Sequence, residues 1–377
     1  MVIKKIPLKD LVDFANQVDK QTSPDGVLPI SRQRALSQSQ NPFASPDDVA
    51  LLVAYDNETC VGYLGVVPGA VQVSPAWVNG SCQKVFWLST WYVSPKVRDS
   101  GVAMQLLFTA CQLKGDIMVT GVSESARRVY AALHFREFGP LRFCNYWVVR
   151  PGRERLLSRL SRVLGGFDRL VVRFIKRRFL RQSLAPLQSL LGDLESRKVS
   201  RIQPPEEFSR AMENQPCTFL RDSKAINWML ENPWLSESAQ TEPRYEFSVF
   251  RQVFHYTALE ITNRATGKYL GYVVMSTSRE KPDNPVALTL LDWALLPEVD
   301  PRVIQALILR EALACEADRI TLPSSLARQL PKPLNLFGQV QEISSLYFAR
   351  LQNRDGDLSQ ALNNPHLHYT DGDRAFT

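Results

Sequence analysis

The amino-acid sequence predicts an α/β protein of two similar domains, each a mixed twisted sheet flanked by helices, joined by a basic helical linker. A chain of 377 residues is too long for one ordinary hydrophobic core and suits two domains of typical size. Strand-like and helix-like patterns alternate through both ends of the chain, and motifs of the first part recur in the same order in the last part. We therefore expect a first domain over 1–150, a linker over 151–200 and a second domain over 201–377.

The first 150 residues predict ten elements in the order β-α-α-β-β-β-α-β-α-β. Apolar runs bounded by turn residues predict the strands, and apolar stripes with helical spacing predict the helices. The expected strands are 2–6, the hairpin 49–67 around Asp56 and Asn57, 84–93, 116–123 and 143–150; the expected helices are 8–20, 30–40, 101–114 and 123–135. Because hairpins and crossovers are combined, we expect mixed strand directions.

The linker concentrates the positive charge of the chain. Residues 150–181 contain eleven Arg or Lys against Glu154 and Asp168, whereas the whole chain has a formal net charge of +7. Apolar residues at alternating spacings of four and three between 156 and 174 predict an amphipathic helix, and 187–197 after Pro186 continue in helical character. Since the rest of the chain is close to neutral, we expect no broad nucleic-acid-binding face.

Three interpretations of this basic helix stay open. As a helix that bridges the two domains, which we favour, it would bury its apolar face and leave its arginines in water. As an interfacial helix, it would insert its apolar face into lipid while its arginines meet an anionic membrane surface; that face contains Phe167, Leu170, Phe174 and Phe179. Contact with nucleic acid is the third interpretation, and few aromatic residues are placed to stack on bases.

The composition argues against several other classes of protein. The first residues lack an apolar core long enough for a secretion signal, and no segment approaches the roughly 20 apolar residues that span a bilayer. The six cysteines are scattered without a CxxC pair, so we expect reduced thiols in a cytoplasmic protein that is at most peripheral to a membrane. With only four histidines, we expect no metal.

The stretch SPKVRDSGVAMQLL, residues 94–107, leaves a predicted buried strand and opens a predicted helix. The first N–H groups of a helix have no intrahelical partner and carry partial positive charge. A phosphate can lie on these groups when no side chain blocks the approach, which explains Gly101 and the small Ala103, and Arg98 adds a full charge. The pattern predicts a phosphate-binding turn, although an ordinary strand-to-helix turn uses the same residue types.

A second motif, SESARRVYAALHF at 123–135, follows this turn along the chain. Together the two motifs resemble the GCN5-related N-acetyltransferase (GNAT) superfamily. In that family Arg/Gln-x-x-Gly-x-Gly/Ala cradles the pyrophosphate of an acyl-coenzyme A, and Asn-x-x-Ala-x-x-Leu-Tyr follows. The resemblance covers 1–150 well and 201–350 in outline, and it implies two GNAT-like domains.

The resemblance also implies a co-substrate, acetyl-CoA or another acyl-CoA, and a set of residues that bind it. The apolar triplet 91–93 would offer backbone groups to the pantetheine arm, and 98–103 would hold the pyrophosphate. The implied coenzyme-binding residues are Trp91, Tyr92, Val93, Arg98, Asp99, Ser100, Gly101, Val102, Ala103 and Ser123. Tyr130 would be the general acid that protonates the leaving thiolate, a role that suits a phenol with a pKa near 10; the alternative is a tyrosine packed beneath the sheet.

Two departures from the family pattern concern single residues, and a third concerns the general base. Ser123 stands in place of the family's Asn, and His134 in place of the Gly before Phe135. Family members often carry a Glu on the central strand or on the strand before the Tyr helix. Those strands offer Ser89, Thr90, Met118 and Thr120 instead. Deprotonation would then use ordered water, Glu124, Asp47 or Asp48, or the acceptor arrives neutral, so we name no base.

The second half repeats the strand, the Trp and the Pro without the phosphate-binding residues. LLDWALLP at 290–297 matches LSTWYVSP at 88–95. After it, Glu298 and Asp300 stand where a phosphate needs positive charge, Val303 replaces the glycine, and Pro301 supplies no N–H. We therefore expect 201–377 to be a degenerate GNAT-like domain that does not bind coenzyme A and that completes the acceptor pocket or stabilises the first domain.

The leading hypothesis is an acyl-CoA-dependent N-acyltransferase in which a primary amine attacks the thioester directly. By resemblance alone, tandem proteins of this kind suggest an amino sugar or a cell-envelope precursor as the acceptor. The alternative hypothesis is a non-catalytic CoA-binding or scaffold protein at the membrane surface, which the missing carboxylate base and the degenerate half both favour.

Overall fold

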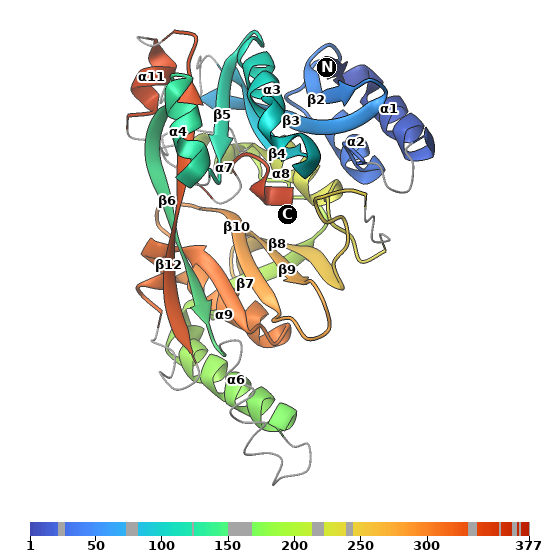
Figure 1. The fold of residues 1–377 in the computed structure, drawn as a ribbon. Coiled ribbons are helices and arrows are strands. Elements are labelled where there is room, and N and C mark those ends of the chain that lie inside the picture. Colours follow the sequence, from blue (N-terminus) through green and yellow to red (C-terminus); the bar gives the residue numbers. More distant parts are fainter. Residues whose placement is uncertain are drawn as a thin grey trace. The chain divides into compact units, whose positions relative to one another are not determined.

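The computed structural model describes residues 1–21, 27–72, 82–122, 124–149, 168–212, 222–238, 244–330, 338–353, 356–363, 368 and 371–376. The chain divides into two compact units, each assembled from segments that are distant in the sequence. Unit 1 contains 1–141, 213–250 and 345–377, and unit 2 contains 142–212 and 251–344. Figure 1 labels their helices and strands.

Unit 1 alternates strands and helices in the predicted order. Its strands are β1 (Val2–Pro7), β2 (Val49–Asp56), β3 (Thr59–Gln72), β4 (Cys82–Val93) and β5 (Asp116–Thr120), with one end each of β6 (Arg136–Trp147) and β12 (Gln339–Arg350). Its helices are α1 (Leu8–Gln21), α2 (Arg32–Ser39), α3 (Val102–Cys111), α4 (Glu124–Ala132), α8 (Ser223–Glu231) and α11 (Asp357–Ala361), with the 3₁₀ turns η1 (Pro95–Ser100) and η3 (Arg374–Phe376).

The sheet of unit 1 has mixed strand directions, as predicted, and a hydrophobic core on each face. The strand order is β1-β2-β3-β4-β5-β12, with β4 and β5 parallel and the other pairs antiparallel. Successive side chains of a strand point to opposite faces. Leu51 and Val53 of β2 pack with α1 and α2, whereas Leu52 and Ala54 pack with α3 and α4. The two cores therefore share one sheet (Figure 1).

Unit 2 contains the linker helix and most of the second half. Its helices are α6 (Asp168–Leu184), α7 (Glu206–Met212), α9 (Arg302–Ala314) and α10 (Ser324–Ala327), with the 3₁₀ turn η2 (Ala185–Leu191). Its strands are β7 (Leu194–Val199), β8 (Val253–Asn263), β9 (Tyr269–Arg279), β10 (Ala287–Leu295) and β11 (Arg319–Pro323), with the other ends of β6 and β12. The strand order is β6-β11-β10-β9-β8-β7.

The element order confirms the α/β fold class and the predicted internal repeat. From β1 to β6 the order is β-α-α-β-β-β-α-β-α-β, and the elements from β7 to β12 follow the same order. β4 and β10, which carry the matching Trp residues, both contain a register shift against the preceding strand. The two halves of the sequence therefore share one plan of secondary structure.

The closing strand of each half pairs with a strand of the other half. Residues 143–147 of β6 pair with β11 in unit 2, and residues 347–350 of β12 pair with β5 in unit 1. Unit 1 also takes 213–250 from the second half. These units differ from the consecutive segments 1–150, 151–200 and 201–377 that the sequence predicts, because a strand pattern indicates that a strand forms but not which strand it pairs with.

Two local predictions were wrong. The closing strand expected at 143–150 begins at Arg136 and ends at Trp147. The helical character expected over 187–197 gives way to a 3₁₀ turn and to β7, which pairs with β8 at the edge of the sheet. An edge strand carries charged residues on its exposed positions, and the short segment LESRKV therefore has no strong strand signature.

The predicted basic helix exists as α6, and it packs in unit 2 against α9. Phe179 and Leu180 are buried there, whereas Leu170 and Phe174, from the predicted apolar face, are 58% and 65% exposed. The interpretation as a bridging helix with a buried apolar face is therefore only partly correct. The remainder of the predicted helix, 151–167, lies outside the described residues.

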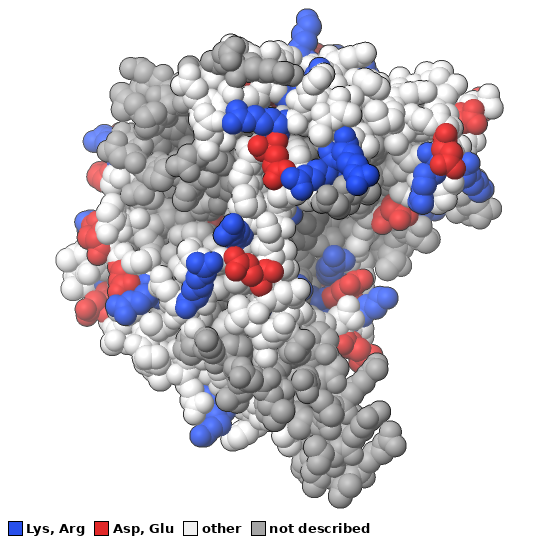
Figure 2. All heavy atoms as spheres, turned by 60° about the vertical axis from the view of Figure 1, so that its left-hand side comes forward, with Lys and Arg blue, Asp and Glu red and all other residues white. Residues whose placement is uncertain are grey.

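Several simple features complete the fold. No helix in the described parts of the chain is long and apolar enough to cross a membrane. Over the same residues, no three His, Cys, Asp or Glu side chains gather as a metal ion would require. Cys60, Cys111, Cys144 and Cys315 are free thiols. On the face drawn in Figure 2, Lys and Arg side chains lie beside Asp and Glu side chains rather than in one continuous patch.

Candidate active site

A β-bulge in β4 lies at the centre of the candidate site. In the pairing of β3 with β4, Thr90 and Trp91 together oppose the single residue Leu64. Thr90 has a φ of 44°, which is rare for a β-branched residue and costs free energy. A bulge redirects the side chains around it. Thr90 accordingly contacts α2, whereas Trp91 contacts Tyr130 of α4 on the other face of the sheet.

β4 and β5 separate at the level of this bulge. Their parallel pairing runs from Val85 with Asp116 to Leu88 with Val119, although β4 continues to Val93. The backbone groups of 89–93 that face β5 therefore have no partner in that strand. An extended ligand can pair with such groups as an added strand would.

Two buried polar atoms flank the point of separation without a partner. The Nε1 of Trp91 on β4 and the Oγ1 of Thr120 on β5 form no hydrogen bond with any described residue. Buried polar groups are almost always hydrogen-bonded, because leaving one unpaired costs free energy. A ligand between the ends of β4 and β5 would lie close to both atoms.

The turn that follows β4 leaves the start of α3 open. Gly101 is the N-cap of α3 with a φ of 78°, a left-handed conformation that favours glycine, and no side chain caps the helix. A Cβ added at Gly101 would meet nothing within 4 Å. Arg98, Asp99 and Ser100 are exposed in η1 directly before it. The first N–H groups of α3 are therefore accessible to an anion.

The matching turn in unit 2 is closed by the chain's own carboxylate. The backbone N–H of Arg302 donates to Oδ1 of Asp300 at 2.8 Å, and the Arg302 guanidinium forms an ion pair with the same carboxylate. Arg302 also lowers the pKa of Asp300. Val303, which stands in place of the glycine, is 2% exposed in the core. An anion at this helix start would have to displace Asp300.

Tyr130 lies in the core between the sheet and α4. It is 3% exposed, and its ring packs on Trp91, Phe135 and Phe348 with centroid separations of 6.1, 5.0 and 6.2 Å. Burial raises the pKa of the Tyr130 phenol above its ordinary value near 10. The hydroxyl is therefore protonated at neutral pH, and the ring stands beside the residue that carries the unpaired Nε1.

On the other face of the sheet, Arg34 of α2 forms a cluster with the bulge. Its guanidinium donates to Oγ of Ser89 at 2.6 Å, to Oγ1 of Thr90, and to the hydroxyl of Tyr245 at 3.2 Å. The carbonyl of Gln38, once its amide is turned, accepts from Nε of Arg34 at 2.9 Å. These partners are all neutral, and Trp234 stacks over the guanidinium at 4.2 Å.

The cluster depends on a glycine in the neighbouring strand. A Cβ added at Gly65 of β3 would collide with the Arg34 guanidinium and would lie 2.8 Å from Oγ1 of Thr90 and 2.9 Å from Oγ of Ser89. Contacts of that length are not tolerated in folded proteins. Gly65 therefore provides the space in which the guanidinium reaches the two hydroxyls of β4.

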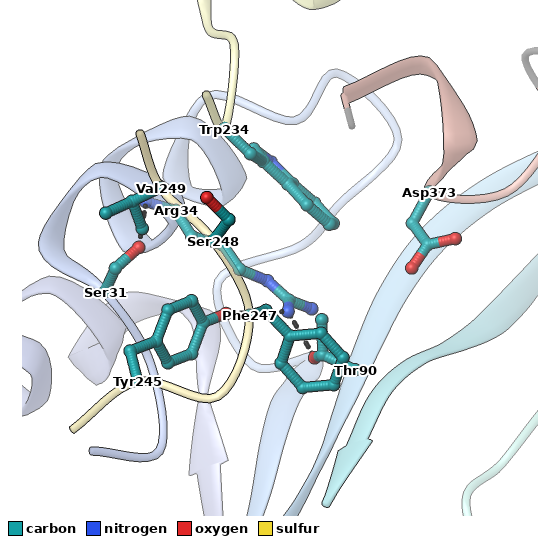
Figure 3. Close-up of a pocket in the computed structure, with 9 residues that line it drawn as sticks. All are labelled: Ser31, Arg34, Thr90, Trp234, Tyr245, Phe247, Ser248, Val249 and Asp373. Carbon is teal, nitrogen blue, oxygen red and sulfur yellow. Dashed lines mark hydrogen bonds between the residues drawn. The ribbon is translucent and has the colours of Figure 1, made fainter. Parts of the chain in front are cut away.

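A cavity of about 240 Å³ opens beside this cluster. Figure 3 shows the lining residues Ser31, Arg34, Thr90, Trp234, Tyr245, Phe247, Ser248, Val249 and Asp373. Ser31 and Arg34 come from the start of α2, and Thr90 comes from the bulge of β4. The other lining residues come from the second half of the chain, at 234, at 245–249 and directly before η3. All belong to unit 1.

The segment that carries Asp373 is fixed by aromatic packing. The Phe376 ring lies between those of Trp228 and Trp234, with centroids 4.7 and 4.8 Å away. Gly372, with a φ of 76°, packs closely on Thr120 and Trp87, so the turn lies against the end of β5. Asp373 therefore projects into the cavity next to the point where β4 and β5 separate (Figure 3).

The sequence-predicted site residues fall into distinct places. The triplet 91–93 is half-buried at the separated end of β4, and Ala103 is half-buried in the first turn of α3. The side chain of Val102 is fully buried in the core, so this residue can meet a ligand only through its backbone. Ser123 and the side chain of Glu124 lie outside the described residues.

Neither aspartate considered as a base from the sequence lines the cavity. Asp47 pairs with Lys9 at 2.7 Å and Asp48 with Lys84 at 2.5 Å. The cavity instead contains Asp373, which no sequence motif singled out. Arg34 and Tyr245 were not identified from the sequence either. Trp234 lies in NPW at 232–234, which repeats NPF at 41–43, and this repeat is the sequence signal that could have drawn attention to it.

The sequence profile of the acetyltransferase (GNAT) family matches residues 17–135. No curated protein matches the sequence. A GCN5-related N-acetyltransferase from Anabaena variabilis is similar in structure, with 12% identity over 93% of this chain and 73% of its own and a TM-score of 0.49. A GCN5-related N-acetyltransferase from Kribbella flavida has 12% identity over 93% of this chain and 70% of its own, with a TM-score of 0.47. A tandem GNAT protein from the clavulanic acid biosynthesis pathway has 10% identity over 94% of this chain and 100% of its own, with a TM-score of 0.42.

The positive φ of Thr90 predicts that two small substitutions differ in stability. Thr90→Ala and Thr90→Gly both remove the hydroxyl that accepts from Arg34. Only glycine adopts this backbone conformation without strain, so we expect Thr90→Gly to be more stable than Thr90→Ala by about 1 kcal/mol. Urea unfolding of the two variants measures the difference, and an alanine variant as stable as the glycine variant would contradict strain at the bulge.

Proposed function

We propose that this chain, whose residues 17–135 form an acetyltransferase domain of the GNAT family, transfers an acetyl group from acetyl-CoA to a primary amine. The observation that carries the proposal is the open left-handed turn at Gly101, which leads from the separated end of β4 into the uncapped start of α3. The corresponding turn of unit 2 is closed by Asp300. We therefore assign the single coenzyme site to unit 1.

The residues present fit an acyl-coenzyme A. The first N–H groups of α3, with Arg98 beside them, suit a pyrophosphate, and the exposed stretch 98–101 lets it approach. The backbone groups of 91–93 that lack a partner in β5 suit the amide groups of a pantetheine arm. The unpaired Nε1 of Trp91 and Oγ1 of Thr120 lie where the thioester end would then reach. By the family pattern, Ser123 joins this set.

Tyr130 is our candidate for the general acid. Its phenol is protonated at neutral pH because burial raises its pKa, and its ring lies against Trp91 at the end of the proposed coenzyme path. A proton delivered to the departing sulfur avoids release of a free thiolate in an apolar site. The amine approaches from the opposite face, where the cavity beside Thr90 is open.

The acceptor is a small-molecule amine in this proposal. A cavity of about 240 Å³ holds a molecule of the size of an amino acid or one sugar ring. Of the acceptors that the family resemblance suggested, an amino sugar fits this size, whereas a larger cell-envelope precursor would place only one residue or ring in the cavity. The polar groups of the cavity narrow the choice of acceptor further.

Coenzyme binding predicts that a negative charge at Gly101 weakens the affinity for acetyl-CoA, whereas the same charge at Gly267 does not. Gly101→Glu places a carboxylate at the start of α3, and we expect it to weaken acetyl-CoA binding about tenfold or more. Gly267 has the same left-handed conformation, with φ of 68°, and equally open surroundings in unit 2. Gly267→Glu carries the same backbone strain and charge away from the site. Calorimetry should give equal affinity for Gly267→Glu and the unmodified chain; equal binding by Gly101→Glu would remove the phosphate-turn assignment.

The acid role predicts a selective loss in Tyr130→Phe. We expect kcat to fall about a hundredfold with little change in KM for acetyl-CoA, because the ring packing is kept and only the proton donor is lost. Since burial raises the pKa of Tyr130, its ionisation removes no activity at neutral or mildly alkaline pH. Tyr146→Phe, another buried tyrosine with a raised pKa, is the control in unit 2. An active Tyr130→Phe with unchanged kcat would exclude the acid role and favour a non-catalytic coenzyme-binding protein.

A second proposal, which extends the scaffold alternative, concerns α6. Leu170, Val171 and Phe174 are all exposed, and this helix carries five Arg or Lys between 173 and 181. Arg173 and Arg177 pair with Glu316, so part of the positive charge is neutralised within unit 2. The exposed apolar residues favour a helix that lies on an anionic membrane surface.

Membrane contact predicts binding to vesicles through these residues. The chain should float with liposomes that contain anionic lipid, and Phe174→Glu should reduce the bound fraction several-fold. Phe108, which is 50% exposed on α3 of unit 1, provides the control Phe108→Glu. Loss of flotation in both variants, or in neither, would contradict a role specific to α6.

A further inference from the structure

The guanidinium of Arg34 is buried among neutral partners. Its side chain is 2% exposed, and within the described residues it forms no ion pair. Its hydrogen-bond partners are hydroxyls and an amide, and its stacking partner is Trp234. The carboxylate of Asp373 is close enough for Arg34 to oppose the rise in its pKa, but no direct ion pair joins the two side chains. A buried guanidinium without a direct ion pair is stabilised when a further anion binds close to it.

Two of the hydroxyls that accept from Arg34 also line the cavity. A guanidinium has only donors, so Thr90 and Tyr245 must accept from it with their oxygens. Their own O–H protons are then directed away from Arg34, and both residues line the cavity. A ligand carboxylate that accepts from these two hydroxyls would have the positive charge of Arg34 directly behind them.

A carboxylate faces the same cavity from another side. Asp373 forms no ion pair with Arg34 or with any other described residue. In Figure 3 its side chain extends towards the cavity from the segment before η3, apart from the guanidinium. Burial raises the pKa of Asp373, whereas Arg34 and Arg374 oppose this shift. One small cavity therefore offers a positive wall and a separate proton acceptor.

The remaining walls are aromatic and leave little room. Trp234, Tyr245 and Phe247 border a space of about 240 Å³, which is small for a ligand site. A molecule that bridges Arg34 and Asp373 must therefore be compact and must carry opposite charges at its two ends.

We propose that this cavity binds an acceptor that carries both an amine and a carboxylate. The carboxylate lies against Thr90 and Tyr245 in front of Arg34, and the amine lies against Asp373. The inference rests on the proposed function, since it names the acceptor class of that same site. Amino acids and acidic amino sugars share this chemistry, and the amine-only sugars do not.

The proposed reaction combines proton transfers with a single acyl transfer. The acceptor ammonium gives one proton to the Asp373 carboxylate, which later releases it to water. The neutral nitrogen then forms the C–N bond to the thioester carbonyl carbon while the C–S bond breaks. The sulfur leaves with the bonding electron pair and takes a proton from Tyr130, and Tyr130 regains a proton from the nitrogen as the amide forms. Asp373 is thus the general base that the sequence did not identify.

The test compares acceptors that differ only in the carboxylate. Amino acids are assayed against their carboxamides, and muramic acid against its carboxamide, with thiol release and the mass of the product as readouts. We expect the carboxylate form to be preferred by about 10-fold to 100-fold in kcat/KM in the matching class. The amino-acid pairs and the sugar pair distinguish the two sources of this chemistry.

Variants of Arg34 and Tyr245 test the proposed carboxylate site, and a variant of Asp373 tests the proposed amine site. Arg34→Met should abolish the preference for the carboxylate form, and Arg34→Lys should restore part of it. Tyr245→Phe removes a single hydroxyl and should reduce the preference a few-fold, which keeps the test valid if Arg34 variants fold poorly. Asp373→Asn should keep the preference but lower kcat. It should also remove the fall of kcat/KM that the unmodified chain shows as the pH drops through the raised pKa of Asp373.

The titration of Asp373 takes place among few charged groups. Arg34 from α2, Arg374 beside it and the phenol of Tyr245 face it, and only the carboxyl changes charge at acidic pH. Equal rates for carboxylate and carboxamide acceptors in the unmodified chain would overturn the inference while leaving the acetyltransferase proposal intact. Absence of acetyl-CoA binding by calorimetry would overturn both.

Discussion

One extra residue in β4 is the constraint on which the whole candidate site depends. The bulge at Thr90 and Trp91 divides these two neighbours between opposite faces of the sheet, and at the same level β4 loses its pairing with β5. On one face Trp91 meets Tyr130 and leads to the open turn at Gly101. On the other face Thr90 meets Arg34 and the cavity. In the proposed reaction, the coenzyme and the acceptor approach the same point of the backbone from these two sides.

The two halves of the chain share one order of strands and helices but differ at the turn that follows the strand with the matching Trp. In unit 1 the start of α3 is left without a cap, and in unit 2 the start of α9 is satisfied by Asp300. A side-chain cap stabilises a helix, whereas an open N-terminus keeps its N–H groups for a ligand. Parts of the second half nevertheless contribute to the site of unit 1, because Trp234, Tyr245 and Asp373 line its cavity.

Sequence reasoning predicted the fold class, the internal repeat and the turn at Gly101, because each of these is encoded in a short contiguous pattern. It could not predict the cavity. Arg34 lies on a weak helix whose pattern gives no reason to bury an arginine, and Asp373 lies in a polar segment that is typical of a surface tail. The positions of both depend on contacts with residues distant in the sequence. Arg34 contacts Trp234 and Tyr245, and the segment of Asp373 is held by the packing of Phe376 between Trp228 and Trp234. The role of Gly65 could not be predicted from the sequence either, because the space that it leaves is filled by Arg34, which is distant in the sequence.

The exchange of closing strands has a consequence for how the protein is made. The sheet of unit 1 is not complete until residues 347–350 pair with β5, more than two hundred positions earlier in the chain. Loops of this length close slowly and raise the contact order, and an unpaired strand edge attracts other chains. The nascent first half therefore emerges from the ribosome with the edge of β5 exposed for as long as synthesis of the second half takes. We expect the two units to fold together after synthesis of the second half rather than one after the other. Until then, the exposed edge of β5 makes the chain prone to aggregation and a substrate for chaperones.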